Sequence, residues 1–304
     1  MIRSLNPTDL AVLLLFLGKS PIDGASTRDR FSRKREGILS QIPIVTSCLI
    51  PQEGRHILGY SRHGLIQGLV GLRRRSGPGK WEIERLLLTD HYEEYGMDLL
   101  ERLGTAWKDI GLERLFLRLD STSPLVDMAR QAGFGHYKSE YLFLLEDRTP
   151  ATVQTDKLGL IQRVKEDDYA LFKLYNTVVP PKVRSAEGMT FQEWVESKEK
   201  AAWKEYVVRK EGDISVWLKL RSDKLAGQFE ILAQSQLSDL SMLVDFCIAE
   251  LRERHLIYCL VSDYQDQLHY MVSEKGFTQV AEYYCFSKQF TQRIREPKLV
   301  PMQV

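Results

Sequence analysis

The alternation of apolar and polar residues predicts a succession of strands and helices along the chain. An apolar run over Leu10–Leu17 follows Pro7 and Asp9 and ends at Gly18, as expected for a helix with a polar first turn. Four residues spaced for one helix face fall within 92–110: Met97, Leu100, Leu103 and Trp107. In the first half, strands are expected at 2–5, 44–50, 56–61, 65–73, 81–88, 115–119 and 141–145, and helices at 7–17, 27–40, 92–110 and 124–132.

The second half repeats this order of elements. A stripe of apolar residues at helical spacing predicts one long helix: Leu240, Leu243, Val244, Cys247 and Leu251. Pro180 and Pro181 are expected to break the chain before the next helix. A strand and a helix are expected within 160–176, further helices at 190–201, 238–254 and 265–273, and strands at 205–210, 214–220, 225–233, 256–261 and 283–288.

Matching sequence features mark the two copies. Ala132-Gly133-Phe134 precedes Tyr141-Leu-Phe143, and Lys275-Gly276-Phe277 precedes Tyr284-Cys-Phe286. A period of roughly 150 residues is too long for a solenoid repeat and fits two domains of one fold. We therefore predict an N-terminal domain over 1–147, a linker over 148–158, a C-terminal domain over 159–291 and a tail over 292–304.

Composition narrows the class of protein. The 304 residues are 43% hydrophobic and 27% charged, with a net charge of +1, so each half has enough apolar residues for a core. The balanced charge argues against a nucleic-acid partner, and the basic runs at 28–35 and 73–75 are expected to be solvated surface or an anion contact.

Cysteine and histidine usage leads to two further expectations. The four cysteines have no C-x-x-C spacing, which indicates a reduced, cytoplasmic protein. The histidines do not have the spacing of a metal site, so no metal is expected. The apolar run at 10–17 is too short to cross a bilayer, and Asp9 before it argues against a signal peptide.

The order of elements, and above all Leu86–Phe143, resembles the GNAT superfamily of N-acyltransferases in its tandem two-domain form. The resemblance implies an α/β fold with two GNAT-like domains, each a mostly antiparallel mixed sheet flanked by helices. In that family the fourth and fifth strands splay apart, and acyl-CoA lies in the notch with its pantetheine arm along the strand edge and its pyrophosphate on a helix N-terminus. The implied cofactor-binding residues in this chain are Leu86, Leu87, Leu88, Tyr95, Gly96 and Met97.

The phosphate-binding pattern of that family is incomplete in both halves. In the first half Gly96 remains, but Glu93 stands where the family has a basic residue and Asp98 where it has a second small residue. These acids also suit a helix start, so a capped helix and a CoA loop that tolerates acids both stay open. In the second half, residues 230–239 contain neither glycine nor a basic residue, and we expect no CoA site there, only a structural role or a wall of the first half's substrate groove.

The catalytic residues implied by the resemblance are incomplete as well. Glu84, on the expected fourth strand, is the candidate general base, with an exposed ion-paired residue as the alternative. The family's general acid, a tyrosine four residues before the Gly-Phe pair, is replaced by Ala129 and Val272. Other candidates near those positions have no fixed direction in the sequence: Tyr137, Tyr141 and Tyr270.

These features lead to one preferred function and two alternatives. The preferred function is an acyl-CoA-dependent N-acyltransferase that moves an acetyl or other acyl group to a small-molecule or peptide amine, with the N-terminal domain as the active copy. The first alternative is a non-catalytic GNAT-like scaffold that binds a ligand or a protein, and the second is a regulatory nucleic-acid partner. The sequence does not identify the acceptor or the oligomeric state.

Overall fold

The computed structural model describes residues 2–5, 7–19, 21–28, 53–62, 64–106, 111–146, 158–199, 202–234 and 239–290. Nearly all of the expected helix at 27–40, the expected strand at 44–50 and the expected tail lie outside these ranges. The strands of the first half are β1 (Ile2–Ser4), β2 (Ile22–Asp23), β3 (Arg55–Arg62), β4 (Leu65–Arg74), β5 (Lys80–Leu88), β6 (Arg114–Asp120) and β7 (Gly135–Leu145). Those of the second half are β8 (Leu160–Gln162), β9 (Lys204–Lys210), β10 (Asp213–Ser222), β11 (Ala226–Ala233), β12 (Leu256–Ser262) and β13 (Thr278–Gln289).

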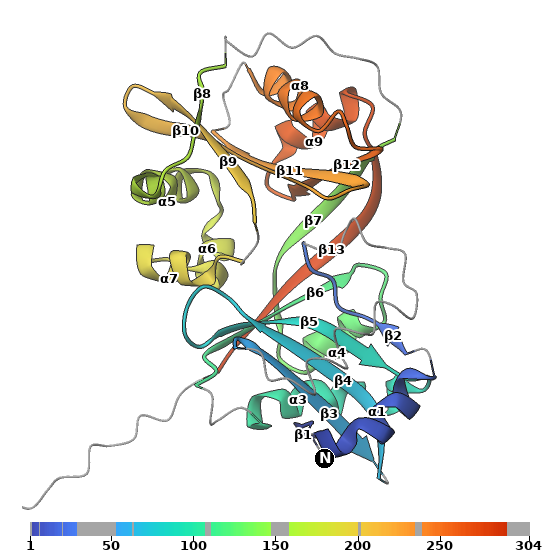
Figure 1. The fold of residues 1–304 in the computed structure, drawn as a ribbon. Helices are drawn as coiled ribbons and strands as arrows, with labels where there is room; N and C mark the ends of the chain where they lie inside the picture. The colour runs from blue at the N-terminus through green and yellow to red at the C-terminus, as the bar shows by residue number, and fades with distance from the viewer. Residues whose placement is uncertain are drawn as a thin grey trace, which may run out of the picture.

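All these strands join one mixed sheet that runs through both halves (Figure 1). Its order is β1-β3-β4-β5-β6-β13-β7-β12-β11-β10-β9-β8, and β2 pairs with β5 off this path. The β5–β6 and β11–β12 pairs are parallel, and the other described pairs are antiparallel. Each half therefore has the mostly antiparallel mixed sheet that the sequence predicts.

Helices cover both faces of the sheet in each half. In the first half α3 (Gly96–Ala106) and α4 (Leu125–Gln131) pack on one face, and α1 (Leu10–Leu17) packs on the other. In the second half α8 (Leu240–Glu250) and α9 (Asp266–Glu274) cover one face, and α5 (Asp168–Val178), α6 (Pro181–Glu187) and α7 (Phe191–Ser197) cover the other. Short 3-10 turns precede three of these helices: η1 (Pro7–Asp9), η4 (Tyr92–Glu94) and η7 (Lys165–Asp167).

The last strands of the two halves are exchanged. β7 follows the first half in sequence but pairs with β12 of the second, whereas β13 pairs with β6 of the first, and the two exchanged strands also pair with each other (Figure 1). The cores follow the same exchange, because Phe143 of β7 is buried with α8 and α9 while Phe286 of β13 is buried with α3 and α4. Each half therefore completes its core with a strand of the other.

Most expected elements form close to their predicted bounds. The Gly-Phe pairs end α4 and α9 as expected, with Gly133 at φ +82° and Gly276 at φ +85°, a backbone conformation that glycine adopts without strain. Several details differ. The strands expected from 141 and 283 begin earlier, at Gly135 and Thr278. On α3, Met97 is 40% exposed while Leu99 lies on the buried face, and Trp107 lies outside the described residues. Pro181 is the first residue of α6, a helix that the sequence analysis did not predict.

Further expectations concern cysteines, metals and membranes. Cys247, Cys259 and Cys285 are free thiols buried in the cores, while Cys48 lies outside the described residues. Within the described ranges no cluster of His, Cys, Asp and Glu could hold a metal ion. No helix in the part of the chain that the structure describes has both the length and the apolar character needed to cross a bilayer.

A network of buried charges lies where the halves meet. We call it the junction network; its basic members are Arg28, Arg73, Arg75, Arg118 and Lys138, and its acidic members are Glu82, Glu140, Glu187, Glu199 and Glu230. The charges of these members balance, which limits the cost of removing them from water. Arg73 and Arg75 of the second basic run thus make buried ion pairs with Glu82, and the expectation that this whole run is solvated surface is wrong.

Glu140 of β7 is the centre of this network. Its side chain is fully buried and accepts hydrogen bonds from Arg28 at 2.6 Å and from Arg118 at 2.8 Å, and Lys138 lies 3.0 Å away. Burial alone would raise the pKa of Glu140, but the charges of Arg118, Arg28 and Lys138 together hold it well below its usual value. The carboxylate is therefore ionised and ties together residues from three separate parts of the sequence.

The strand exchange predicts where core mutations act. Phe286→Ala should loosen the first half and Phe143→Ala the second, each with a loss of about 3–5 kcal/mol of unfolding free energy, because a large buried ring is removed. Hydrogen exchange by mass spectrometry should show faster exchange in β3–β6 for Phe286→Ala and in β10–β12 for Phe143→Ala. The reverse distribution would contradict the exchange.

Glu140→Gln should cost about 3–5 kcal/mol of unfolding free energy at neutral pH, since it leaves three buried cations without their shared counter-charge. Because the folded pKa of Glu140 lies below the unfolded value near 4.5, its contribution is complete above that pH and is lost as the pH falls toward the folded value. Urea unfolding of the wild type and the variant should therefore converge in acid. Glu101→Gln, at an exposed position of α3, serves as the control and should leave the unfolding free energy unchanged at both neutral and acid pH.

Candidate functional site

The parallel strands β5 and β6 diverge in the first half. Their ladder runs from Lys80↔Arg114 to Glu82↔Phe116, and β5 then continues to Leu88 without β6 beside it. A notch therefore opens between them at the place where the resemblance puts the acyl-CoA arm.

The chain itself fills this notch. Ile22 and Asp23 pair with Leu88 and Leu87, the Gly24 N–H donates to the Leu86 carbonyl at 2.9 Å, and on the other side Ala25 forms a bridge with Leu119. We call Ile22–Ser26 the filling segment. The packing is tight, because a Cβ atom on Gly24 would lie 2.2 Å from the Leu125 side chain.

The predicted cofactor-binding residues on β5 are bonded to this segment. The Leu86 N–H donates to Asp23 Oδ1 at 3.0 Å, and Arg85 holds the other carboxylate oxygen of Asp23 at 3.0 Å. Leu86, Leu87 and Leu88 are all buried. Their backbone edge is thus occupied by the chain's own strand.

The other predicted cofactor-binding residues lie at the start of α3. Tyr95 is buried and its hydroxyl donates to the Gln67 carbonyl at 2.6 Å, Gly96 begins the helix, and Met97 is exposed. Asp98 accepts a hydrogen bond from the Tyr60 hydroxyl at 2.9 Å and pairs with Arg102 one turn later. Asp98 therefore belongs to a helix surface and does not obstruct the notch.

The predicted general base Glu84 is paired with arginines. Its carboxylate lies 3.4 Å from Arg55 and 3.8 Å from Arg73, on the edge of the junction network. Its neighbour Glu82 is buried, and burial together with Glu199 raises the pKa of Glu82. Glu84 is thus ion-paired, as in the alternative that the sequence left open, but it is half-buried rather than exposed.

The strands β11 and β12 diverge in the same way in the second half. Their ladder ends at Phe229↔Cys259, and the side chain of Gln265 spans the point of divergence. Its amide nitrogen donates to the Ile231 carbonyl at 2.6 Å, and its amide oxygen accepts from the Ser262 N–H at 3.0 Å. Because strand residues alternate in direction, the backbone of Ala233 faces the same side as that of Ile231.

A groove of about 520 Å³ opens beyond Gln265. We call it the donor groove; it is lined by Thr177, Val178, Ile231, Ala233, Gln234, Leu240, Tyr264, Gln265, Asp266, Gln267 and Leu268. Its walls come from the end of α5, the end of β11 and the starts of α8 and α9. This is the notch of the second half, and none of its described lining residues belongs to a strand laid between β11 and β12.

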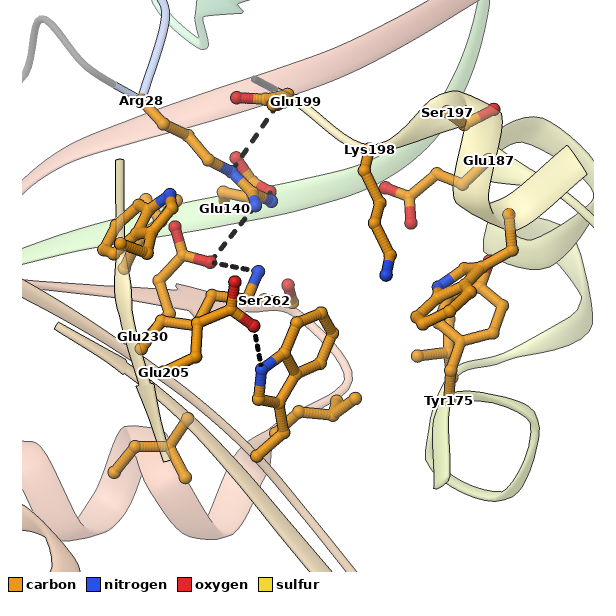
Figure 2. Close-up of a pocket in the computed structure, with 18 of the residues that line it drawn as sticks. Arg28, Glu140, Tyr175, Glu187, Ser197, Lys198, Glu199, Glu205, Glu230 and Ser262 are labelled. Carbon is orange, nitrogen blue, oxygen red and sulfur yellow. Dashed lines mark hydrogen bonds and ion pairs between the residues drawn. The ribbon is translucent and has the colours of Figure 1, made fainter. Parts of the chain in front are cut away.

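A second cavity of about 330 Å³ lies next to the donor groove, on the face of the sheet that α5, α6 and α7 cover (Figure 2). We call it the acceptor cavity. Its aromatic lining residues are Tyr175, Trp194, Trp203, Trp217 and Tyr264. The first half contributes Arg28, Arg75, Ser76, Lys138 and Glu140, so the junction network forms one wall. Ile231, Tyr264 and Gln265 line both the cavity and the donor groove, which therefore meet at these residues.

Three buried side-chain oxygen atoms of the residues that line the acceptor cavity lack a hydrogen-bond partner among the described residues. They are the Tyr175 hydroxyl, the Ser197 hydroxyl and Oε1 of Glu230. The other oxygen of Glu230 accepts from Arg28 at 3.1 Å and lies 3.6 Å from Lys219. Buried polar atoms are normally satisfied, so a water or a ligand is expected to bond these three.

Tyr264 and Lys198 are two of the cavity's titratable groups whose pKa values are shifted by burial. Burial raises the pKa of Tyr264 to about 12, so its phenol is protonated at neutral pH. Burial lowers the pKa of Lys198, which points into the cavity (Figure 2), lies 3.0 Å from Asp168 and sits 3.7 Å from the centre of the Trp194 ring. Tyr264 is thus a proton donor at the meeting point of the two cavities.

The sequence analysis did not single out Glu230 or Tyr264. A signal for both exists in the sequence, since Glu230 lies on the second copy's fourth strand as Glu84 does on the first, and Tyr264 directly follows the second copy's fifth strand. The positions four residues before the Gly-Phe pairs, Ala129 and Val272, are fully buried in the cores and face no site.

The other tyrosines considered from the sequence lie elsewhere. Tyr137 is buried under α5–α7, and Tyr141 contacts the ring of His269. Tyr270 is 63% exposed on α9. None of these three is among the residues that line the acceptor cavity or the donor groove.

Comparison with known proteins is informative at the level of structure. No protein-family model matches the chain, and no curated protein does. A GCN5-related N-acetyltransferase from Sphaerobacter thermophilus is similar with a TM-score of 0.57 at 13% identity, over 95% of both chains. A putative acetyltransferase from Thermoplasma acidophilum is similar with a TM-score of 0.52 at 10% identity, over 95% of this chain and 100% of the other.

A tandem GNAT protein from the clavulanic acid biosynthesis pathway is also similar, with a TM-score of 0.51 at 11% identity, over 95% of this chain and 98% of that one. Each likeness extends over 95% of this chain. The chain therefore has the fold of the GCN5-related N-acetyltransferase superfamily, in the two-copy arrangement that the sequence predicts.

Proposed function

We propose that this protein is an acyl-CoA-dependent N-acyltransferase and that its second half carries the reaction. The observation that supports this most directly is the meeting of the donor groove and the acceptor cavity at Ile231, Tyr264 and Gln265. An acyl thioester in one and an amine in the other would approach each other where β11 and β12 diverge.

The donor groove suits the pantetheine arm of a thioester. Its volume of about 520 Å³ is in the range of small-molecule sites, and its walls are mostly apolar and amide side chains. The backbone of Ala233 at the strand edge offers an N–H and a carbonyl to the amides of the arm, as in other strand-addition binding. The N–H of Ile231 faces the same side and would hold the oxyanion of the tetrahedral intermediate.

Glu230 is the proposed base for the amine. Glu230 lines the acceptor cavity, and its buried oxygen Oε1 has no hydrogen-bond partner among the described residues, while Arg28 holds the other oxygen and fixes the side chain. The carboxylate takes a proton from the ammonium, directly or through a water, and the neutral amine attacks the thioester carbonyl. The C–N bond forms, the C–S bond breaks with its electron pair on the leaving sulfur, and the second proton passes from the nitrogen to water as the amide is completed.

Tyr264 is the proposed partner of the leaving sulfur. Its phenol is protonated at neutral pH because burial raises its pKa to about 12. It would donate a hydrogen bond to the thiolate as negative charge develops, which lowers the barrier to C–S cleavage. The thiolate then leaves with the pantetheine arm through the donor groove.

The first half has a different role in this proposal. Its notch contains the filling segment, and its candidate base Glu84 is paired with Arg55 and Arg73. It would serve as the non-catalytic scaffold considered from the sequence, with its charged residues forming a wall of the acceptor cavity. The assignment to the second half differs from the sequence analysis, which favoured the first.

Tyr264→Phe should lower kcat about 100-fold with little change in KM, because it removes only the hydrogen bond to the leaving sulfur. The measurement is thiol release from acetyl-CoA with a panel of primary amines. Tyr270→Phe is the matched control, since Tyr270 is exposed on α9, and it should leave the rate unchanged. Equal rates for both variants would exclude Tyr264 from the reaction.

Glu230→Gln and Glu84→Gln form a second matched pair, each on the diverging strand of its own half just beyond the last residue of the parallel ladder. We expect Glu230→Gln to lower kcat at least 100-fold and Glu84→Gln to leave kcat near the wild-type value. Thermal unfolding of both variants controls for loss of ion pairs. The opposite result would move the active site to the first half, as the sequence analysis expected.

A further inference from the structure

The described part of the donor groove offers no cationic side chain to a phosphate. Among its described lining residues there is no Lys, Arg or His, and the one charged residue is Asp266. An adjacent cavity of about 300 Å³ shares Gln265 and Asp266 with it and adds a second carboxylate, Asp263. His269 of α9 also lines this adjacent cavity, and its ring packs against the rings of Tyr141 and Phe143. The first Lys or Arg after α9, Lys275, is bonded to Asp245 at 2.6 Å.

The chain between β11 and α8 lacks the usual residues of a phosphate-binding turn. The sequence from Gln234 to Leu240 reads Gln-Ser-Gln-Leu-Ser-Asp-Leu, with no glycine and no basic residue. Close approach of several backbone N–H groups to a phosphate normally uses glycine, and charge neutralisation needs Lys or Arg. Asp239, directly before α8, adds a further negative charge.

The apolar and amide part of the groove, by contrast, is well formed. Gln265 fixes the divergence of β11 and β12 with two hydrogen bonds, and Ile231, Val178, Leu240 and Leu268 line the walls. The pantetheine arm is uncharged, and its two amides and thioester would contact these apolar and amide side chains. The phosphates of CoA, by contrast, would lie near the carboxylates of Asp263 and Asp266.

On this basis, and resting on the proposed function, we propose that the donor groove recognises acyl thioesters by their pantetheine arm alone. The nucleotide end of CoA contributes no affinity at this site. The ligand class is therefore any acyl-pantetheine thioester, whether or not it carries the adenosine phosphates.

The first test compares acetyl-CoA, acetyl-dephospho-CoA and acetyl-pantetheine by titration calorimetry on the full chain without acceptor. The three Kd values should agree within about threefold, whereas a site that bonds the phosphates would lose about 100-fold or more on their removal. The Kd of acetyl-CoA should not weaken when salt is raised from about 50 to 500 mM, since no favourable phosphate contact is screened. Acetyl-CoA binding more than tenfold tighter than acetyl-pantetheine would overturn the proposal.

The second test uses Asp266→Lys. This variant should tighten acetyl-CoA binding about tenfold and leave acetyl-pantetheine unchanged, because it converts a repulsive charge into an attractive one. Glu274→Lys, at the other end of α9, is the matched control and should change neither Kd. Equal effects of Asp266→Lys on both ligands would contradict the role of charge.

The proposed function and this inference fail in different ways. If no thioester binds at millimolar concentration, the acyltransferase proposal itself is wrong and the donor groove has another occupant. If acetyl-CoA binds with strong salt dependence and acetyl-pantetheine does not bind, the acyltransferase proposal stands and the inference about the nucleotide is wrong.

Discussion

The buried carboxylate of Glu140 is the interaction on which the joining of the two halves depends. It lies on an exchanged strand and contacts Arg28, Arg118 and Lys138. Buried charges add little to stability when compared with well-packed apolar residues, but they penalise any arrangement that leaves them unpaired. A wrong register of β7 would leave the Glu140 charge buried without its partners. The junction network thus supports one arrangement of the exchanged strands and, with it, one shape of the acceptor cavity.

The two halves show how one fold leads to two different notches. In both, a parallel strand pair diverges after a short ladder. In the first half the filling segment bonds to both strands of the diverging pair through Gly24 and Ser26 and satisfies their backbone groups from within the chain. In the second half Gln265 bonds to both strands at the point of divergence, and no described strand fills the rest of the notch, which is the donor groove. Backbone groups at a diverging strand edge need partners, which is why the second notch is the one proposed for a ligand.

Local patterns predicted the elements well, because they depend on neighbouring residues. Gly133 and Gly276 end their helices for a steric reason that is visible in the sequence, and the alternation in Trp81–Leu88 gives a strand. The exchange of β7 and β13 was not predictable in this way, since both strands have the same pattern and nothing local selects the partner. The filling segment escaped prediction as well, because β2 is only two residues long and has no periodicity. Glu230 and Tyr264 were not predicted because residues 230–239 lack the glycine and basic residues of a phosphate-binding loop, which argued against any site in the second half.

The filled notch of the first half also explains how that half can form part of the second half's site. Asp23 of the filling segment neutralises Arg85, and Arg28, two residues after Ser26, extends from the same stretch of chain to Glu140 and Glu230. The segment that closes one notch therefore also supplies the cation that orients the proposed base of the other. In this arrangement one short stretch of backbone both fills the first notch and organises the acceptor cavity. A first half that kept an open acyl-CoA notch could not place Arg28 in this position without a different route for the chain.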